Sequence, residues 1–187
     1  MISEIYVILI IQIKMSENNH SSECACCTTA RGGPNPIDTM IKERGMAIVQ
    51  IDEPPASPFY YSVGVSGGCD QRVEFFMAGL EPECVNSTIG KLAELYKQTP
   101  KLFAKNGAIP KVIKITNKQG TIVNANAYIR TITDEAYITC CGQLQARYGK
   151  RIRVLQVFIP DTEGRAFNHP QYDKHLRHIQ CPFISGN

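Results

Sequence analysis

Ionisable and aromatic side chains gather in one short stretch near the carboxyl end of the chain: Asp161, Glu163, Arg165, His169 and Tyr172. A carboxylate beside an imidazole supplies a general base and the group that orients it. Asp161 and His169 are therefore candidate catalytic residues of a hydrolase-like enzyme. The alternative is structural, because acids in turns commonly bond backbone N–H groups two residues on. In that interpretation Asp161 is an exposed turn acid, and Asp161→Asn changes stability by only about 0.5 kcal/mol.

The stretch before this loop reads as a buried strand. Ile152 to Ile159 is apolar and β-branched, and Pro160 ends it because proline has no N–H to donate. The continuous apolar pattern predicts a central strand with both neighbours paired. A rigid scaffold often presents functional side chains just past such a strand. A ligand pocket between this strand and an earlier hairpin would use Tyr61, Ser62, Gly64, Asp161, Gly164 and Tyr172, which are the predicted binding residues.

Cysteines suggest half of a zinc site. Cys24 and Cys27 have the two-residue gap that zinc loops prefer. The further ligands would come from Cys181, or from Cys69, His169, His175 or His178. No second short cysteine pair completes the pattern, so a reduced segment without metal is the alternative. Zinc is the one cofactor that the sequence suggests.

Composition limits the compartment and the partners. The chain has 187 residues and a formal net charge of +3, which is too small and scattered for a nucleic-acid surface. Eight cysteines without a secretion signal indicate reduced thiols, and hence the cytoplasm of a cell or of a virus's host. The apolar run from Ile5 to Ile13 is too short to cross a bilayer. We expect no transmembrane segment.

The amino-terminal residues differ in character from the rest. Residues 1–35 read as a flexible arm with the cysteine cluster, and residues 36–187 as a single domain. The run before Lys14 is a β-strand added to a sheet, a sticky arm for a partner, or an extension upstream of a true start at Met15. The last of these is favoured, so removing residues 1–14 should leave the fold intact.

Hydrophobic periodicity predicts an α+β fold. Its mainly antiparallel sheet has about five to six strands, with two to three helices packed on it. Tyr60 and Tyr61 point to opposite faces of one strand, so one should be core and the other exposed. The last helix should run unbroken from Glu135 to Tyr148 with Ile138 facing inward. One expected helix covers 36–45, a second opens at 81–83 and stops before Pro100, and a third covers 135–148. The expected strands cover 46–51, 59–65, 73–77, 112–115, 121–130 and 152–159.

Several short motifs resemble a known family. They are Gly45-Met46-Ala47-Ile48, Pro58-Phe59-Tyr60-Tyr61-Ser62-Val63-Gly64-Val65, Gly79-Leu80, Val154-Leu155-Gln156-Val157 with Pro160-Asp161 and Gly164, and Gln180. Together they resemble the domain-of-unknown-function family 4262, over roughly residues 24–183. Its members are bacterial, phage and viral proteins with no established activity. The resemblance therefore implies membership of a family but no mechanism. Where the family usually has Gly-His-Pro-Glu, this chain has the segment from Gly68 to Glu74.

Three functions compete on this evidence. The favoured one is a non-enzymatic binding or structural accessory protein of a phage or virus that acts through contacts with a protein partner or as a homo-oligomer. The second is the hydrolase-like enzyme that uses Asp161 and His169. The third is a small-ligand sponge or sensor.

Overall fold

One sheet forms the centre of the protein. The computed structural model describes residues 10–14, 35–52, 58–66, 72–149 and 151–180. In these ranges seven strands lie in the order β1-β2-β3-β4-β7-β6-β5. The pairs β1–β2 and β4–β7 are parallel, and the other four are antiparallel. The strands are β1 (Ile10–Lys14), β2 (Ala47–Asp52), β3 (Phe59–Val63), β4 (Val73–Ala78), β5 (Gly107–Thr116), β6 (Ile122–Thr131) and β7 (Arg153–Phe158).

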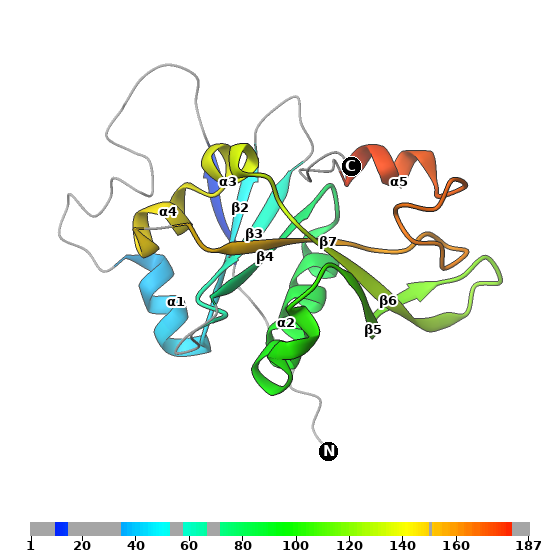
Figure 1. The fold of residues 1–187 in the computed structure, drawn as a ribbon, viewed down its shortest axis with the longest axis horizontal. Helices are drawn as coiled ribbons and strands as arrows, with labels where there is room; N and C mark the ends of the chain where they lie inside the picture. The colour runs from blue at the N-terminus through cyan, green and yellow to red at the C-terminus, as the bar shows by residue number, and fades with distance from the viewer. Residues whose placement is uncertain (1–9, 15–34, 53–57, 67–71, 150, 181–187) are drawn as a thin grey trace.

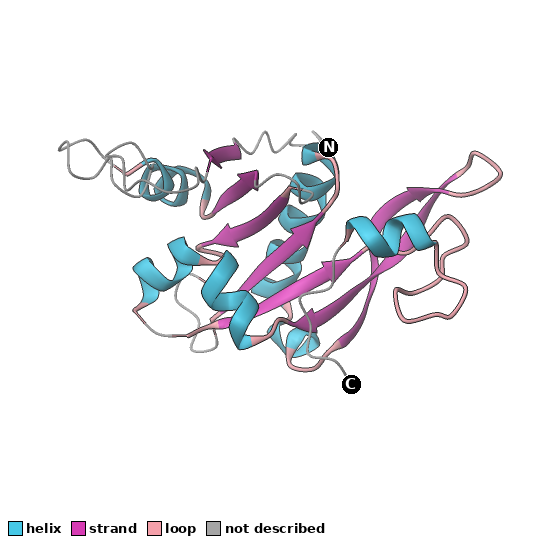
Figure 2. Ribbon diagram, turned by 90° about the horizontal axis from the view of Figure 1, so that it is seen from above, coloured by secondary structure: helices cyan, strands magenta, loops and turns pink. Residues whose placement is uncertain are grey.

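Helices cover both faces of this sheet. The described ranges contain α1 (Pro36–Arg44), α2 (Pro82–Gln98), α3 (Asp134–Cys140), α4 (Gly142–Tyr148) and α5 (Lys174–Ile179). In Figure 1, α1 and α2 lie below the sheet and α3, α4 and α5 above it. Figure 2 views the sheet from above and shows the β5–β6 ribbon reaching beyond the helices. The predicted α+β class with a mainly antiparallel sheet is confirmed.

β7 is the central strand of the sheet, as its apolar pattern predicts. It pairs with β4 on one side and with β6 on the other. Leu155 is fully buried, and Val154 and Val157 are each 1% exposed. Both edges of β7 are therefore closed, and the loop that follows it starts from a fixed point.

The two faces of β4 meet different helices. The ring of Phe75 lies 5.5 Å from that of Phe103, which lies 5.5 Å from the ring of Tyr96 on α2. The neighbouring Glu74 points to the opposite face, where the hydroxyl of Tyr148 on α4 donates to its carboxylate. Successive strand residues alternate between faces, so both sides of the sheet are core.

This double cover corrects the expectation for Tyr60 and Tyr61. Both side chains are only 1% exposed, so neither is a surface residue. The two side chains do point to opposite faces of β3, but one of them would be exposed only if one face of the sheet were open to solvent. Here α2 and the α3–α4 pair leave no wet face at β3.

The last predicted helix is broken, contrary to expectation. Cys141 has φ −112° and ψ 42° and separates α3 from α4. Gly142, a weak helix former, follows directly. The side-chain nitrogen of Gln145 donates across this break to the carbonyls of Tyr137 and Ile138. The Tyr137 carbonyl also accepts from the backbone N–H of Cys141. Ile138 is 67% exposed instead of inward-facing.

The β5–β6 ribbon is longer than its sequence pattern suggests. Its turn is as predicted: the Asn117 side chain accepts from the backbone N–H groups of Gln119 and Thr121. β5 begins at Gly107, ahead of the predicted start, and its register shifts between Ile109 and Ile113. The ribbon therefore reaches back to the end of β7.

The amino-terminal expectations are tested only in part. Residues 10–14 form β1 beside β2, which agrees with the added-strand interpretation. A true start at Met15 stays a prediction. The domain limits at residues 35 and 36 stay a prediction.

Candidate functional site

Asp161 organises the loop after β7. One carboxylate oxygen accepts from the N–H groups of Glu163, at 3.0 Å, and Arg165, at 2.9 Å. The other accepts from the Arg165 guanidinium at 2.7 Å and from the N–H of Asp173 at 3.3 Å. The carboxylate thus ties the turn to the start of α5.

These contacts correct the expectation of an exposed turn acid. Asp161 is 1% exposed. Desolvation raises the pKa of its carboxyl, but the hydrogen bonds from Arg165 and Glu163 and the charge of Arg165 outweigh that effect and lower the pKa overall. The buried carboxylate therefore holds the loop after β7 in place, and we call this arrangement the Asp161 brace.

Asp161 and His169 do not form the predicted dyad. No hydrogen bond joins them, and four donors already occupy the Asp161 oxygens. The Nδ1 atom of the exposed His169 accepts from the N–H of Gln171. The two side chains therefore have separate hydrogen-bond partners in this structure.

Tyr172 belongs to a buried polar chain that fastens α5 to β7. Its hydroxyl donates to the carbonyl of Ile159 at 2.8 Å and accepts from the side chain of Gln180. The side chain of the fully buried Gln156 donates to the carbonyl of Gln180 at 2.8 Å. Burial raises the pKa of Tyr172 to about 12, so it stays a neutral phenol. Its role here is to position the loop.

A second buried carboxyl, Glu74, lies at the end of the β3–β4 hairpin. Its oxygens accept from the hydroxyl of Ser62 at 2.6 Å, from the N–H groups of Gly64 at 2.8 Å and Val65 at 3.3 Å, and from the hydroxyl of Tyr148 at 2.9 Å. Desolvation raises the pKa of Glu74, and these hydrogen bonds oppose the shift. These four hydrogen bonds hold the β3–β4 hairpin against α4.

A surface hollow, which we call the larger hollow, lies between the β5–β6 ribbon and the Asp161 turn. Its volume is about 400 Å³. An ion pair between Lys118 and Glu163 joins the tip of the ribbon to the turn. The lining residues are Ile115, Asn117, Gln119, Val123, Asn124, Ala125, Asn126, Thr162, Glu163 and Gly164.

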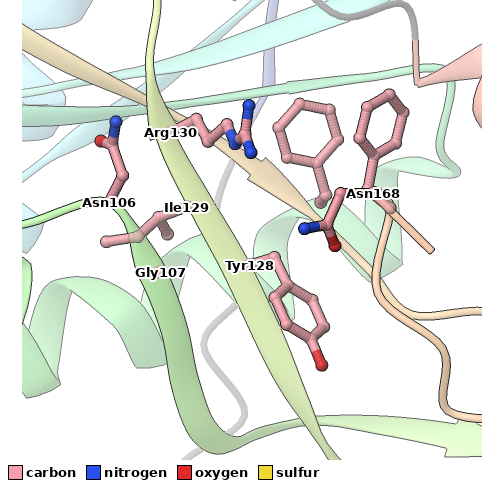
Figure 3. A pocket seen from close by; sticks show the side chains of 8 residues that line it. Asn106, Gly107, Tyr128, Ile129, Arg130 and Asn168 are labelled. Carbon is pink, nitrogen blue, oxygen red and sulfur yellow. The ribbon is translucent and has the colours of Figure 1, made fainter. Parts of the chain in front are cut away.

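The smaller hollow, of about 130 Å³, is the next one along β6. Asn126 lines the larger hollow and Tyr128 the smaller one, and two strand residues on one face are about 7 Å apart. Figure 3 shows the guanidinium of Arg130 and the side-chain amide of Asn168 turned toward the same space, while the Tyr128 hydroxyl points away. The lining residues are Asn106, Gly107, Tyr128, Ile129, Arg130, Phe158, Phe167 and Asn168.

The predicted binding residues separate into two groups. Gly164 lines the larger hollow, and Asp161 and Tyr172 hold the loop that forms its wall. Tyr61, Ser62 and Gly64 lie on the other hairpin: Ser62 and Gly64 bind Glu74, and the buried Tyr61 accepts from the N–H of Gln143. Arg130 and Asn168 were not among the residues predicted from the sequence. A charged residue in an alternating strand was the available signal for Arg130.

The predicted metal ligands Cys24, Cys27 and Cys181 lie outside the described residues. Within the described ranges, no three His, Cys, Asp or Glu side chains are close enough to share an ion. His169, His175 and His178 therefore make no metal cluster with other described residues, and zinc stays a prediction.

The described part of the chain contains no helix both long and apolar enough to cross a membrane. No curated protein and no solved structure matches the sequence. A family model does match, over residues 40–173, a narrower span than the motifs suggested. The chain belongs to the family described as Domain of unknown function (DUF4262).

Proposed function

We propose that the protein is a non-enzymatic binding module that holds a segment of a protein partner against β6 and the loop after β7. The observation that carries this proposal is the larger hollow between these two elements. The side chains of Gln119, Asn124 and Thr162 line it and make no hydrogen bond to any described residue. The fold leaves these polar groups free for a ligand.

The ionisable groups favour binding over chemistry. Glu163, the one carboxylate among the lining residues of both hollows, is paired with Lys118. The buried carboxyls of Asp161 and Glu74 are occupied by backbone and side-chain donors. A general base must reach the proton that it removes, so the engagement of these three carboxyls supports binding over the hydrolase-like alternative.

The walls favour a peptide over a small metabolite. A volume of about 400 Å³ falls within the range of small-ligand pockets, but such pockets are mostly apolar and well enclosed. Amide side chains are suited to a peptide backbone, which offers an N–H and a C=O at nearly every residue. Ile122, 68% exposed, lies two residues before Asn124 on the same strand face and offers a small apolar contact.

Co-purification with a blocked variant tests the proposal. The tagged protein is recovered from its native cells as wild type, as Asn124→Arg, which fills the larger hollow, and as Gln98→Arg, a control at the exposed end of α2. We expect one protein to be retained in stoichiometric amount by the wild type and the control and to be lost from Asn124→Arg. Equal retention by all three would refute this site, and a bound small molecule in native mass spectra would favour the sensor alternative.

A further inference from the structure

Arg130 is a half-buried cation that has no counter-ion among the residues that the structure describes. It lies on β6 opposite Gln156 of β7, and both flanking residues of its strand, Ile129 and Thr131, are paired in the sheet. Its guanidinium makes no hydrogen bond or ion pair with any described residue. Five N–H donors in a rigid fork are thus held on the central sheet and left unused.

Two carboxylates of the loop after β7 are already paired with other cations. Asp161 is paired with Arg165, and Glu163 with Lys118. A further cation, Arg177, lies 5.3 Å from the centre of the Phe167 ring. Removing a charge from water without a partner is costly, so this region of the surface is poised to accept an anion.

The other walls of the smaller hollow suit a small planar group. The Asn106 side-chain oxygen accepts from the N–H and the hydroxyl of Thr131, which leaves the Asn106 amide N–H₂ as a donor. The Asn168 amide faces the same space as Arg130. The rings of Phe158 and Phe167, 4.3 Å apart, form an apolar wall.

The volume sets the size of the group. Water occupies roughly 30 Å³ in the liquid, so a hollow of about 130 Å³ holds about four atoms the size of a water oxygen. A carboxylate with its one attached carbon, as in acetate, has four non-hydrogen atoms. Arginine also binds carboxylates through two parallel hydrogen bonds.

We infer that the smaller hollow is a carboxylate-binding site in which Arg130 and Asn168 hold an aspartate, a glutamate or the carboxyl terminus of the protein partner. This inference rests on the proposed function, since the partner segment in the larger hollow extends along β6 into the smaller one. The inference adds the chemical group that anchors the partner: a carboxylate about two residues along the partner segment from the part that lies in the larger hollow.

A titration with acetate tests the site without knowledge of the partner. Acetate, and the neutral isostere acetamide as control, are added to the ¹⁵N-labelled full chain at constant ionic strength. We expect acetate to shift the Arg130 Nε–H and Asn168 side-chain signals along saturable curves, and acetamide to leave them unchanged. Equal responses to both, or linear responses only, would overturn the inference. Phosphate binding about tenfold tighter than acetate would also overturn it, because the site would then be one for tetrahedral oxyanions.

Variants assign the effect to the guanidinium. Arg130→Gln should weaken acetate binding by about tenfold or more, the loss of one charge-assisted hydrogen bond. Lys114→Gln, an exposed cation on β5 outside both hollows, should bind acetate as the wild type does. If Arg130→Gln does not fold, the acetate and acetamide comparison on the wild type still decides.

Two further peptides separate the sources of the carboxylate once a partner is known. One carries an internal glutamate and an amidated end, and the other a free carboxyl terminus and no acidic side chain. Binding of only one identifies the source, and binding of neither, with acetate bound, overturns the partner assignment alone. A partner captured without any acetate response would leave the proposed function standing and refute this site.

Discussion

Two buried carboxyls, those of Glu74 and Asp161, hold loops of this protein in place. Their environments shift their pKa values in opposite directions. Burial raises the pKa of Glu74, which has no cation among its hydrogen-bond partners. Hydrogen bonds and the charge of Arg165 lower the pKa of Asp161 although it too is buried. The two residues should therefore respond oppositely to pH.

Glu74→Gln tests the hairpin lock. The glutamine side chain keeps the shape of Glu74 but places its N–H₂ group opposite N–H and O–H donors. We therefore expect the free energy of unfolding to fall by about 1–3 kcal/mol. Because the folded pKa is raised, the carboxyl contributes its full stability below about pH 4.3, and this contribution is lost as pH rises through the folded pKa. The advantage of the wild type over Glu74→Gln should thus shrink from acid to neutral pH in urea unfolding curves. Glu94→Gln, on the exposed face of α2, is the control; an advantage that grows with pH would contradict the assignment.

Asp161→Asn tests the loop brace. The substitution removes the negative charge beside Arg165 and one hydrogen-bond-accepting oxygen. We expect it to lower the free energy of unfolding by about 2–3 kcal/mol, well above the value for an exposed turn acid. The folded pKa is lowered, so this contribution is present above about pH 3.9 and is lost as pH falls through the folded value. Glu163→Gln removes an exposed ion pair in the same turn and should cost less than about 1 kcal/mol. Equal costs for the two variants in chemical unfolding would refute the brace.

The residue types in these loops were predictable, but their partners were not. Asp161 and Gly164 have the chemistry of a tight turn, which the structure confirms by the hydrogen bond from Gly164 N–H to the Asp161 carbonyl. The donors from Arg165 and Asp173 depend on how the loop returns to β7. Glu74, a charged residue inside an apolar strand, was a readable signal of a buried polar site.

At the scale of elements, α5 is held against the sheet by a close approach at Gly79. This glycine has φ +67°, and a Cβ built on it would lie 1.9 Å from the carbonyl oxygen of Ile179. Only a residue without a side chain fits there. The Gly79-Leu80 motif therefore marks the place where the end of α5 docks.

Gly79→Ala should separate α5 from β4. We expect faster amide exchange in α5 and a melting temperature several degrees lower, since the new methyl group would overlap backbone atoms. Gly120→Ala is the matched control, because Gly120 has φ +76° but open space around it. Equal losses would show that backbone conformation alone matters, which would contradict the docking account.

The edge strand β1 offers a second test. Deletion of residues 1–14 leaves β2 paired with β3, so we expect cooperative unfolding to persist. The uncovered edge of the buried strand β2 should promote self-association, visible by light scattering at rising concentration. Deletion of residues 1–9 keeps β1 and is the control. A fully unfolded product would contradict the prediction that the rest of the chain folds without this segment.

Local patterns predicted most elements, and the misses have physical causes. The stripe on α2 and the turn at Asn117 are set by nearby residues and were predictable. The break at Cys141 was not, because it depends on Gln145 reaching back to two carbonyls. The early start of β5 depends on pairing with β6, which propensity does not encode.

At the scale of the whole molecule, the proposed site is built from distant parts of the chain. Asn106, Arg130 and Asn168 come together because β6 lies between β5 and β7 and because the Asp161 brace folds the loop back. The spacing of these three residues along the sequence does not indicate that they come together in the fold. The central position of β7 was predictable, and with it the place of the loop, but not which residues would face the loop across the strands.

The most direct test is a hydrogen-exchange footprint of the captured partner on the full chain. The account predicts that binding slows amide exchange in β6 and in residues 159–173 and leaves β2 and α2 unchanged. Because both sets are read in one experiment, loss of global stability cannot mimic the pattern. Protection confined to the face formed by α1 and α2, with β6 and residues 159–173 exchanging as in the free protein, would contradict it.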